Sequence, residues 1–445
     1  MKILFLTDNF PPESNAPAIR TYEHCLEWVE QGAEVTVITC APNFPSGKVH
    51  AGYRNKWRQE EMMDGIRVIR VWSYITPNRG LTKRILDYLS FCFTGFLASL
   101  RVKSDVIVAT SPQLFTAVAG YLASFFKRTP WVMEIRDLWP ESIKAVGAIE
   151  TSRVIKVLDR LVNFLYHRAD RLVVVTDAFK KRMETLGVPP EKVKVVKNGV
   201  HIHQYQGVTR NEDLVKQYGL DGKFVVAYIG THGMAHKLDF ILDSAQHVKE
   251  KDIHFLFIGD GAFKSRLLKQ LAALKLSNVT MLAPIPKSEV PEHIALADVA
   301  LINLRKQKTF EKVLPSKIFE NAAMGKPILL GVNGEARALV EHYGAGLYYE
   351  PENQADFLAQ LTKLYQQRNN FAPYQAACLQ LAQDFDRKRL AVNMFHILVD
   401  LHTEARPTTE PVPNMRLTDP IATYSTTPTV DTENQEPLNE HEVAE

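Results

Sequence analysis

Cysteine is scarce in this chain of 445 residues, which has only four. None of them forms a Cys-x-x-Cys pair or lies near a histidine at metal-ligand spacing, so neither a disulfide framework nor a zinc site is expected. A reducing compartment fits best. No apolar region of signal length precedes Asp8 and Pro11-Pro12, so we expect no secretory signal and a cytoplasmic protein.

Two motifs are also missing. No Gly-x-Gly-x-x-Gly follows the first strand-like segment, which argues against a dehydrogenase that uses a dinucleotide. No Asp-x-Asp cluster lies beside a strand, so we expect no metal site and no requirement for a divalent cation.

Charge is unevenly distributed. The net charge of the chain is +3, but residues 404–445 carry nine acids and two arginines, a net of −7 that leaves +10 for residues 1–403. A basic body indicates anionic partners such as phosphorylated metabolites, nucleic acid or an anionic membrane surface.

Short apolar runs alternate with helical stretches in two series, which predicts parallel sheets covered by helices on both faces. The runs are 3–7, 35–40, 68–72, 106–109, 131–135 and 172–176, then 224–230, 254–259, 279–282, 299–304 and 327–330. Segment 193–206 lacks periodicity and is the candidate linker. Two such sheets that face one another leave a cleft at the carboxyl ends of their strands, where open α/β folds bind ligands.

The end of the chain divides into a helix and a tail. Residues 384–402 carry a broad apolar stripe typical of a packed helix. Beyond it the chain is rich in Pro, Thr and Glu and poor in large apolar residues, so residues 404–445 are predicted to be disordered. The predicted units are 1–203, 204–383, a helix 384–403 that crosses back to the first domain, and an acidic tail 404–445.

The stretch 81–103 is the candidate membrane element. It contains Phe91, Phe93 and Phe96 between basic flanks, but Asp87 interrupts it and the uninterrupted part is shorter than the ~20 residues of a spanning helix. A helix packed in the first domain and a monotopic helix on an anionic leaflet both stay open.

The most informative segment is 314–327, where Pro315 and Ser316 begin a short helix and Gly325 and Pro327 end it. Lys317 in its first turn opposes the helix dipole by roughly 0.3–1 kcal/mol, which makes sense if an anion docks there. We expect Lys317 and free backbone N–H groups to hold a phosphate, and Glu320 to accept hydrogen bonds from sugar hydroxyls.

This segment resembles the donor-binding helix of retaining family 4 ("group 1") glycosyltransferases of the GT-B fold, which has two facing Rossmann-like domains. The resemblance extends over residues 1 to about 402, and other segments support it: 8–13, 134–142 and 228–237. It is closest to bacterial fucosamine and N-acetylhexosamine transferases of O-antigen and colanic-acid pathways.

The resemblance implies roles for individual residues. The implied catalytic group is Asp137, Arg136, Lys317 and Glu320. The implied donor-binding group is Gly230, Thr231, His232, Gly233, Lys237, Gly261, Arg305, Ser316, Lys317 and Glu320. The implied acceptor-binding group is Pro12, Glu13, Arg20 and Glu141.

Some positions depart from the family pattern. Family 4 enzymes often have two carboxylates seven residues apart, but here Lys312 stands at the position paired with Glu320, and Glu311 is displaced by one. The first loop has Ser14-Asn15-Ala16 in place of a glycine pair, and Arg136 precedes Asp137 where a histidine is common. The basic clamp after the first strand of the donor domain is also incomplete.

The function implied is transfer of a hexosamine or deoxyhexose from a nucleotide-diphosphate donor to a lipid-linked or growing glycan in cell-surface polysaccharide biosynthesis, with retention and without a cofactor. The partners expected are a nucleotide sugar and a lipid-linked saccharide but no nucleic acid, at the inner face of the plasma membrane. Two alternatives stay open, a UDP-sugar epimerase on the same fold and a non-catalytic scaffold of a polysaccharide assembly complex.

Overall fold

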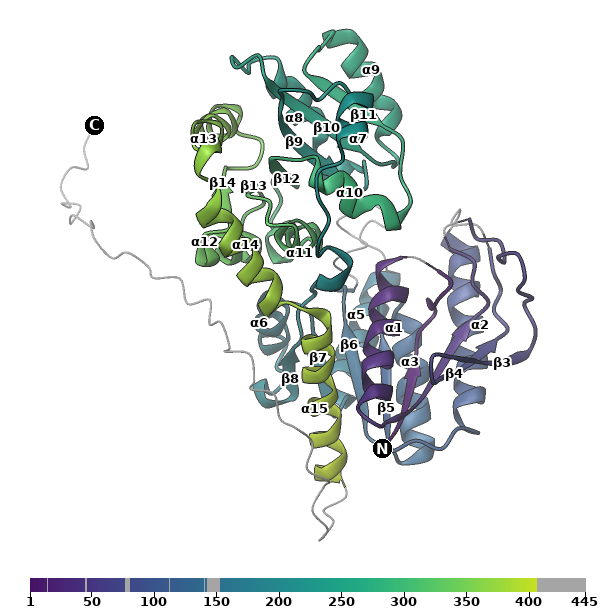
Figure 1. Ribbon diagram of the computed structural model, residues 1–445. Coiled ribbons are helices and arrows are strands. Elements are labelled where there is room, and N and C mark those ends of the chain that lie inside the picture. The colour runs from purple at the N-terminus through teal and green to yellow at the C-terminus, as the bar shows by residue number, and fades with distance from the viewer. Residues whose placement is uncertain are drawn as a thin grey trace, which may run out of the picture.

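The computed structural model describes residues 1–405 apart from 14, 45, 77–80, 112, 140 and 142–152. Two α/β domains lie one above the other, each built on its own sheet (Figure 1). This is the predicted GT-B arrangement of two Rossmann-like domains, and it is confirmed. Disorder was predicted for residues 404–445, of which 406–445 lie outside the described residues.

The first sheet has eight strands in the order β3-β4-β2-β1-β5-β6-β7-β8. All neighbours pair in parallel except β3, which is antiparallel to β4 at the edge. The strands are β1 (Lys2–Leu6), β2 (Glu34–Cys40), β3 (Arg58–Met63), β4 (Ile66–Val71), β5 (Val106–Thr110), β6 (Trp131–Ile135), β7 (Arg171–Val174) and β8 (Val193–Val195). The strand order reverses between β1 and β5, where Ile3 pairs with Val35 on one side and Val106 on the other.

Helices cover both faces of this sheet because alternate strand residues are apolar on both sides. Leu4 and Leu6 pack toward α2, α3, α5 and α6, whereas Ile3 and Phe5 pack toward α1 and α15. The helices are α1 (Ala16–Glu30), α2 (Leu81–Ser99), α3 (Leu114–Lys127), α5 (Arg153–Arg168), α6 (Asp177–Thr185) and α15 (Arg387–Ala405).

The second sheet has six parallel strands in the order β11-β10-β9-β12-β13-β14, and its strand order reverses between β9 and β12. The strands are β9 (Phe224–Ile229), β10 (Ile253–Ile258), β11 (Val279–Leu282), β12 (Val299–Asn303), β13 (Ile328–Gly331) and β14 (Gly346–Tyr348). The helices are α7 (Glu212–Gln217), α8 (Leu238–Ala245), α9 (Lys264–Leu274), α10 (Val290–Ala295), α11 (Lys317–Ala323), α12 (Glu335–Tyr343), α13 (Gln354–Gln366) and α14 (Ala372–Asp384).

The chain passes between the domains twice, at neighbouring places. After β8 it leaves the first domain, and after α14 it returns as α15, which packs on α1 (Figure 1). The Trp28 indole donates to the Ala391 carbonyl at 2.9 Å. The two crossings are joined by Val200 N–H to Phe385 O at 3.0 Å and Arg387 N–H to Val200 O at 2.9 Å.

Three strands differ from the sequence expectation. β8 lies inside the segment 193–206 that was interpreted as a linker, because Val193 and Val195 extend the sheet alongside β7. β3 is an edge strand whose charged sequence shows no apolar run, and β14 has only three residues. Glu404 was assigned to the tail, but it lies in the last turn of α15 and forms an ion pair with Arg171.

Candidate functional site

The donor-domain loops after β9 and β10 pack backbone against backbone at the carboxyl edge of the sheet. Gly230 N–H donates to Ile258 O at 2.8 Å, and His232 N–H donates to Asp260 O at 2.8 Å. A Cβ at Gly259 would overlap the Gly230 carbonyl, and one at Gly261 would come within 2.5 Å of His232 O. Both loops therefore need glycine for this close approach.

Lys317 begins α11, and its side chain crosses the end of β9. A Cβ on Gly230 would overlap its amine, and Gly230 has φ +142°, which disfavours any L side chain there. The ammonium lies over the Tyr228 ring, 5.4 Å from its centroid. Burial lowers the pKa of Lys317, and among the described residues no carboxylate is within ion-pair distance of it.

Glu320 lies one turn after Lys317 on the same helix and is half-buried. Within the described part of the chain its carboxylate accepts no hydrogen bond and forms no ion pair. Its charge partly offsets the effect of burial on the pKa of Lys317, and it also acts on Tyr205, whose pKa is raised mainly by burial. Neither the Lys317 amine nor the Glu320 carboxylate is therefore held by a hydrogen bond or ion pair with a described residue.

The start of α11 differs from the expectation in one respect. Ser316 already has helical φ and ψ and its side chain makes no capping hydrogen bond. The N–H groups of residues 318–320 donate to the carbonyls of Pro315 and Ser316. These three groups are not free to bind a phosphate. The N–H groups of Ser316 and Lys317 have no acceptor among the described residues, so these two groups and the Lys317 amine remain for the anion expected here.

The polar side chains of the β9 loop are largely occupied or covered. His232 is completely buried, and neither ring nitrogen has a partner. Burial lowers its pKa to about 4, as it does for His236. Lys237 pairs with Asp239 at 3.2 Å. The side chains of His232 and Lys237, which were expected to contact the donor, are thus covered or already paired. The N–H groups of Thr231 and Gly233, by contrast, have no acceptor among the residues described.

Residues at the end of β12 also hold the loop that follows β9. The Asn303 amide at the end of β12 donates to His236 O at 2.9 Å, and the Tyr349 hydroxyl donates to Asn303 Oδ1 at 2.7 Å. Arg305 N–H donates to Ala235 O at 2.8 Å. Asn303 and Tyr349 were not predicted from the sequence. The only signal for them is that a polar residue stands at or just after the end of a strand.

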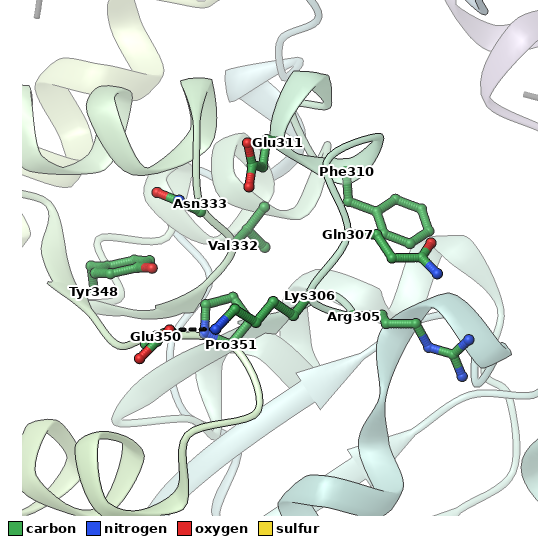
Figure 2. Close-up of a pocket in the computed structure, with 10 residues that line it drawn as sticks. All are labelled: Arg305, Lys306, Gln307, Phe310, Glu311, Val332, Asn333, Tyr348, Glu350 and Pro351. Atoms are coloured by element: carbon green, nitrogen blue, oxygen red, sulfur yellow. Dashed lines mark hydrogen bonds and ion pairs between the residues drawn. The ribbon is translucent and has the colours of Figure 1, made fainter. Parts of the chain in front are cut away.

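A small pocket lies beside this loop at the ends of β12, β13 and β14. Among the residues that line it, Lys306 Nζ forms an ion pair with Glu350 Oε1 at 2.5 Å. Figure 2 shows that the side chain of Arg305 points away from this ion pair. The guanidinium of Arg305 makes no hydrogen bond or ion pair with any described residue. It is therefore available to a ligand, and its role in binding the donor stays a prediction.

In the acceptor domain, Arg136 and Asp137 follow β6. Burial lowers the pKa of Arg136 to about 10, although Glu134 opposes this effect. Its guanidinium lies 3.4 Å from Pro17 O, and both Arg136 and Asp137 are half-buried. The two side chains proposed as catalytic thus lie at the carboxyl edge of the first sheet, on a different domain from Lys317 and Glu320.

Three of the four expected acceptor residues are engaged within the protein. The Glu13 carboxylate accepts from Asn43 N–H at 2.7 Å and Phe44 N–H at 2.9 Å, and burial raises its pKa. Arg20 forms a buried ion pair with Glu134 at 3.0 Å. Glu141 pairs with Arg182 at 2.6 Å and approaches Lys312 of the other domain to 3.7 Å. Pro12 alone is exposed.

Asp8 begins the segment 8–13 that supports the family resemblance, but no role was predicted for this residue. It follows β1, where the order of the first sheet reverses. Burial, with help from Glu13 and Asp87, raises its pKa to about 7. Its position at the end of the first strand was the signal that could have identified it.

The carboxyl edges of the two sheets face each other and are joined by Glu335. Its carboxylate, at the start of α12, accepts from Asp177 N–H at 3.1 Å and Ala178 N–H at 3.0 Å at the start of α6. Lys197 lies 3.1 Å from Glu335 and 2.6 Å from Asp177. Burial lowers the pKa of Lys197, but these two carboxylates outweigh it and raise the pKa overall.

Two absences concern the described part of the chain. It contains no group of three or more His, Cys, Asp or Glu side chains placed to hold a metal ion. Its helices include none with the length and apolar character needed to cross a bilayer.

Family models match both domains. The glycosyl transferase 4-like domain matches residues 15–199, and the glycosyl transferases group 1 domain matches residues 223–367. The chain is a family 4 glycosyltransferase of the GT-B fold.

Two curated proteins are similar to this glycosyltransferase. The putative colanic acid biosynthesis glycosyl transferase WcaI of Escherichia coli is 26% identical over 366 residues, which is 79% of this chain and 89% of that protein. The probable glycosyltransferase WbjE of Pseudomonas aeruginosa is 28% identical over 292 residues, 64% of this chain and 72% of that protein.

Solved structures share the fold of this glycosyltransferase. Anabaena HepE in complex with UDP and glucose has a TM-score of 0.66 at 20% identity and covers 90% of this chain and 99% of its own. Sucrose-phosphate synthase from Thermosynechococcus elongatus has a TM-score of 0.72 at 13% identity and covers 91% of this chain and 100% of its own.

Proposed function

We propose that this glycosyltransferase transfers a sugar, a hexosamine or a deoxyhexose, from a nucleotide-diphosphate donor to a lipid-linked or growing glycan in cell-surface polysaccharide biosynthesis. The observation that carries the donor side is the Lys317 amine, which is held against Gly230 and the Tyr228 ring without a carboxylate partner. The names of the similar curated proteins, with colanic acid biosynthesis among them, support the biosynthetic context. UDP and glucose in the HepE structure support a nucleotide-sugar donor.

Charge explains how this site would act. A diphosphate beside Lys317 would favour the ammonium form and offset the lowering of its pKa by burial. As the glycosidic bond breaks, negative charge grows on the leaving phosphate, so Lys317, Arg305 and the N–H groups of Thr231 and Gly233 would stabilise the transition state more than the bound donor. Glu320 would accept hydrogen bonds from hydroxyls of the nucleotide ribose.

The acceptor would bind at the facing edge of the first sheet, near Asp8, Arg136 and Asp137. We propose retention of the anomeric configuration, with the leaving phosphate helping to remove the proton from the acceptor hydroxyl. The cations around the phosphate would take the place of a divalent metal in this scheme.

The donor site is tested with Lys317→Met and Glu320→Gln. Since neither side chain makes a hydrogen bond or ion pair with a described residue, the fold should be retained, whereas transfer should fall by about 10²–10³ for Lys317→Met. Thermal shifts with a panel of nucleotide sugars measure binding, since a ligand of the native state raises its stability. Lys269→Met, an exposed lysine of α9, is the matched control.

Wild-type transfer and an unchanged thermal shift in Lys317→Met would contradict the donor assignment. Analysis of products with and without an acceptor tells transfer from epimerisation of the donor sugar.

A further inference from the structure

The outer face of α2 is apolar although it is exposed. Leu86, Leu89, Phe93 and Leu100 are all more than 40% exposed and recur at helical spacing along one stripe, where a helix of a soluble domain usually carries charge. The opposite face, which includes the completely buried Phe91, packs in the core. For Phe91 the structure therefore agrees with the packed-helix alternative, and this ring is not available to a membrane.

The apolar surface continues onto α3. Phe125 and Phe126 at the end of this helix are 65% and 63% exposed, and Phe126 contacts Phe96 of α2 with ring centroids 5.5 Å apart. Phe125 lies 5.5 Å from Phe126 and 6.4 Å from Tyr121. The two helices thus share one aromatic surface.

A third helix extends it. Phe164 of α5 meets Tyr121 edge to face at 5.2 Å, and Val157 is exposed one helical repeat earlier. We call the face formed by Leu86, Leu89, Phe93, Leu100, Phe125, Phe126, Val157 and Phe164 the apolar face. Contiguous exposed apolar patches of this kind mark interaction sites.

Cations border the apolar face. The exposed lysines and arginines on these helices and their ends are Lys83, Arg84, Arg101, Lys103, Arg128, Arg153, Lys156, Arg160 and Arg168. The Arg168 guanidinium stacks on the Phe164 ring, 5.4 Å from its centroid. Nearby acids are engaged inside the protein, since Asp87 accepts from Ser73 Oγ at 2.6 Å and Asp170 accepts from Trp131 N–H at 2.9 Å.

The apolar face belongs to the acceptor domain. Among the described residues of the donor domain and α14, only Met234, Leu268 and Leu379 are large exposed apolar side chains. α2 lies at the outer side of the first domain (Figure 1), and its first half reaches the acceptor edge, where Asp87 helps to raise the pKa of Asp8. A surface that is bound here would therefore lie next to the proposed acceptor site.

We propose that the apolar face docks on the surface of an anionic lipid bilayer, with Phe93, Phe125 and Phe126 inserted at the level of the headgroups and the bordering lysines and arginines on lipid phosphates. Apolar side chains within a basic border are what such a surface requires, and charge complementarity distinguishes it from a neutral one. Docking of this face on a bilayer does not depend on the transfer reaction.

The test is co-sedimentation of the full chain with vesicles, without a nucleotide sugar. Binding should be strong on vesicles of phosphatidylcholine with phosphatidylglycerol, weak on phosphatidylcholine alone, and reduced when salt is raised to about 0.5 M. The triple variant Phe93→Ser, Phe125→Ser and Phe126→Ser should lose about 10-fold or more of the partition coefficient. Leu268→Ser with Leu379→Ser is the matched control and should bind like the wild type.

Circular dichroism and thermal melting establish that the triple variant is folded. The proposal is overturned if the wild type binds neither kind of vesicle, or if the folded triple variant binds as well as the wild type. A concentration-dependent dimer that forms without lipid and is lost in the triple variant, together with no vesicle binding, would assign the face to a second copy instead. Because nucleotide-sugar binding is measured separately, either hypothesis can fail alone.

Discussion

At the scale of single residues, close approach matters more than charge in assembling the donor loops. Gly230, Gly259 and Gly261 let two backbone loops and the Lys317 side chain meet where a Cβ would collide with a carbonyl or with the Lys317 amine. The charged side chains of the same loop contribute less, since His232 is covered and Lys237 pairs locally. A substitution at Gly230 should therefore damage the site as much as loss of the lysine.

Gly230→Ala tests this directly. The new methyl group would displace Lys317, and the positive φ adds strain, so we expect donor binding to weaken by at least about 10-fold and unfolding free energy to fall by about 1–2 kcal/mol. Thermal shifts with nucleotide sugars and denaturant titration measure the two effects. Gly222→Ala, which also has positive φ but open space around it, should lose stability alone.

Asp8 gives a pH-dependent prediction. Its pKa is raised from 3.8 to about 7, so the folded state binds the proton more tightly than the unfolded state. Its contribution to stability is therefore largest at low pH and is lost as pH rises from about 4 to about 7. Asp8→Asn should be more stable than the wild type by about 1–2 kcal/mol at pH 8 and equal to it near pH 4, as measured by urea unfolding. A constant difference across this range would contradict the assignment.

At the scale of elements, α15 is the helix that ties the two halves of the sequence together. Its apolar stripe was readable, and the stripe packs on α1 and the first sheet through Met394, Phe395 and Leu398. Its return to the first domain was predicted, but α1 as the helix it packs on was not, because periodicity shows which face of a helix is buried but not which element covers that face. Through this contact, the C-terminal residues of the described chain stabilise the N-terminal domain.

Phe395→Ala should show this in unfolding. Removal of a buried phenyl ring costs about 3–5 kcal/mol, and the loss should fall on the first domain rather than the second. Hydrogen exchange of β1 and β5, compared with β9 and β12, measures where protection is lost. Equal loss in both sheets would mean that the domains unfold together.

Most strands were predictable because a buried parallel strand is a continuous apolar run. β3, β8 and β14 were not, because their sequences are charged or short and their pairing depends on a neighbour. In the site, Lys317 and Glu320 were predicted from the place of their charges on a short helix, where a cation in the first turn opposes the helix dipole. The structural roles of Glu13, Arg20 and Glu141 depend on contacts across more than 25 residues of sequence, which no local pattern encodes.

At the scale of the whole molecule, the two domains touch through a charged cluster. Glu335 accepts two backbone N–H groups across the interface and pairs with Lys197. We expect Glu335→Gln to lower the unfolding free energy by about 1–3 kcal/mol and to increase the radius of gyration in small-angle scattering, because the domains separate more readily. Glu341→Gln, an exposed residue of α12 that pairs with Arg337, should change neither.

The tail gives a second prediction at this scale. Because residues 406–445 are poor in large apolar side chains, their removal should leave transfer and melting temperature unchanged. The truncation should keep Glu404, which pairs with Arg171. A loss of activity in the truncated protein would show that the tail takes part in the reaction or in binding the acceptor.

The paired crossings between the domains limit how the enzyme can move. A single connecting segment would let one domain swivel about any of three axes. Here two segments lie side by side, bonded through Val200, Phe385 and Arg387, with Gly199 pressed against the Phe385 carbonyl. We therefore expect the domains to rotate most easily about a hinge axis that runs through both crossings. A twist about the long axis of the molecule would break the hydrogen bonds between the two crossings. Donor and acceptor would then meet along a single arc, so that their alignment is repeated at every turnover.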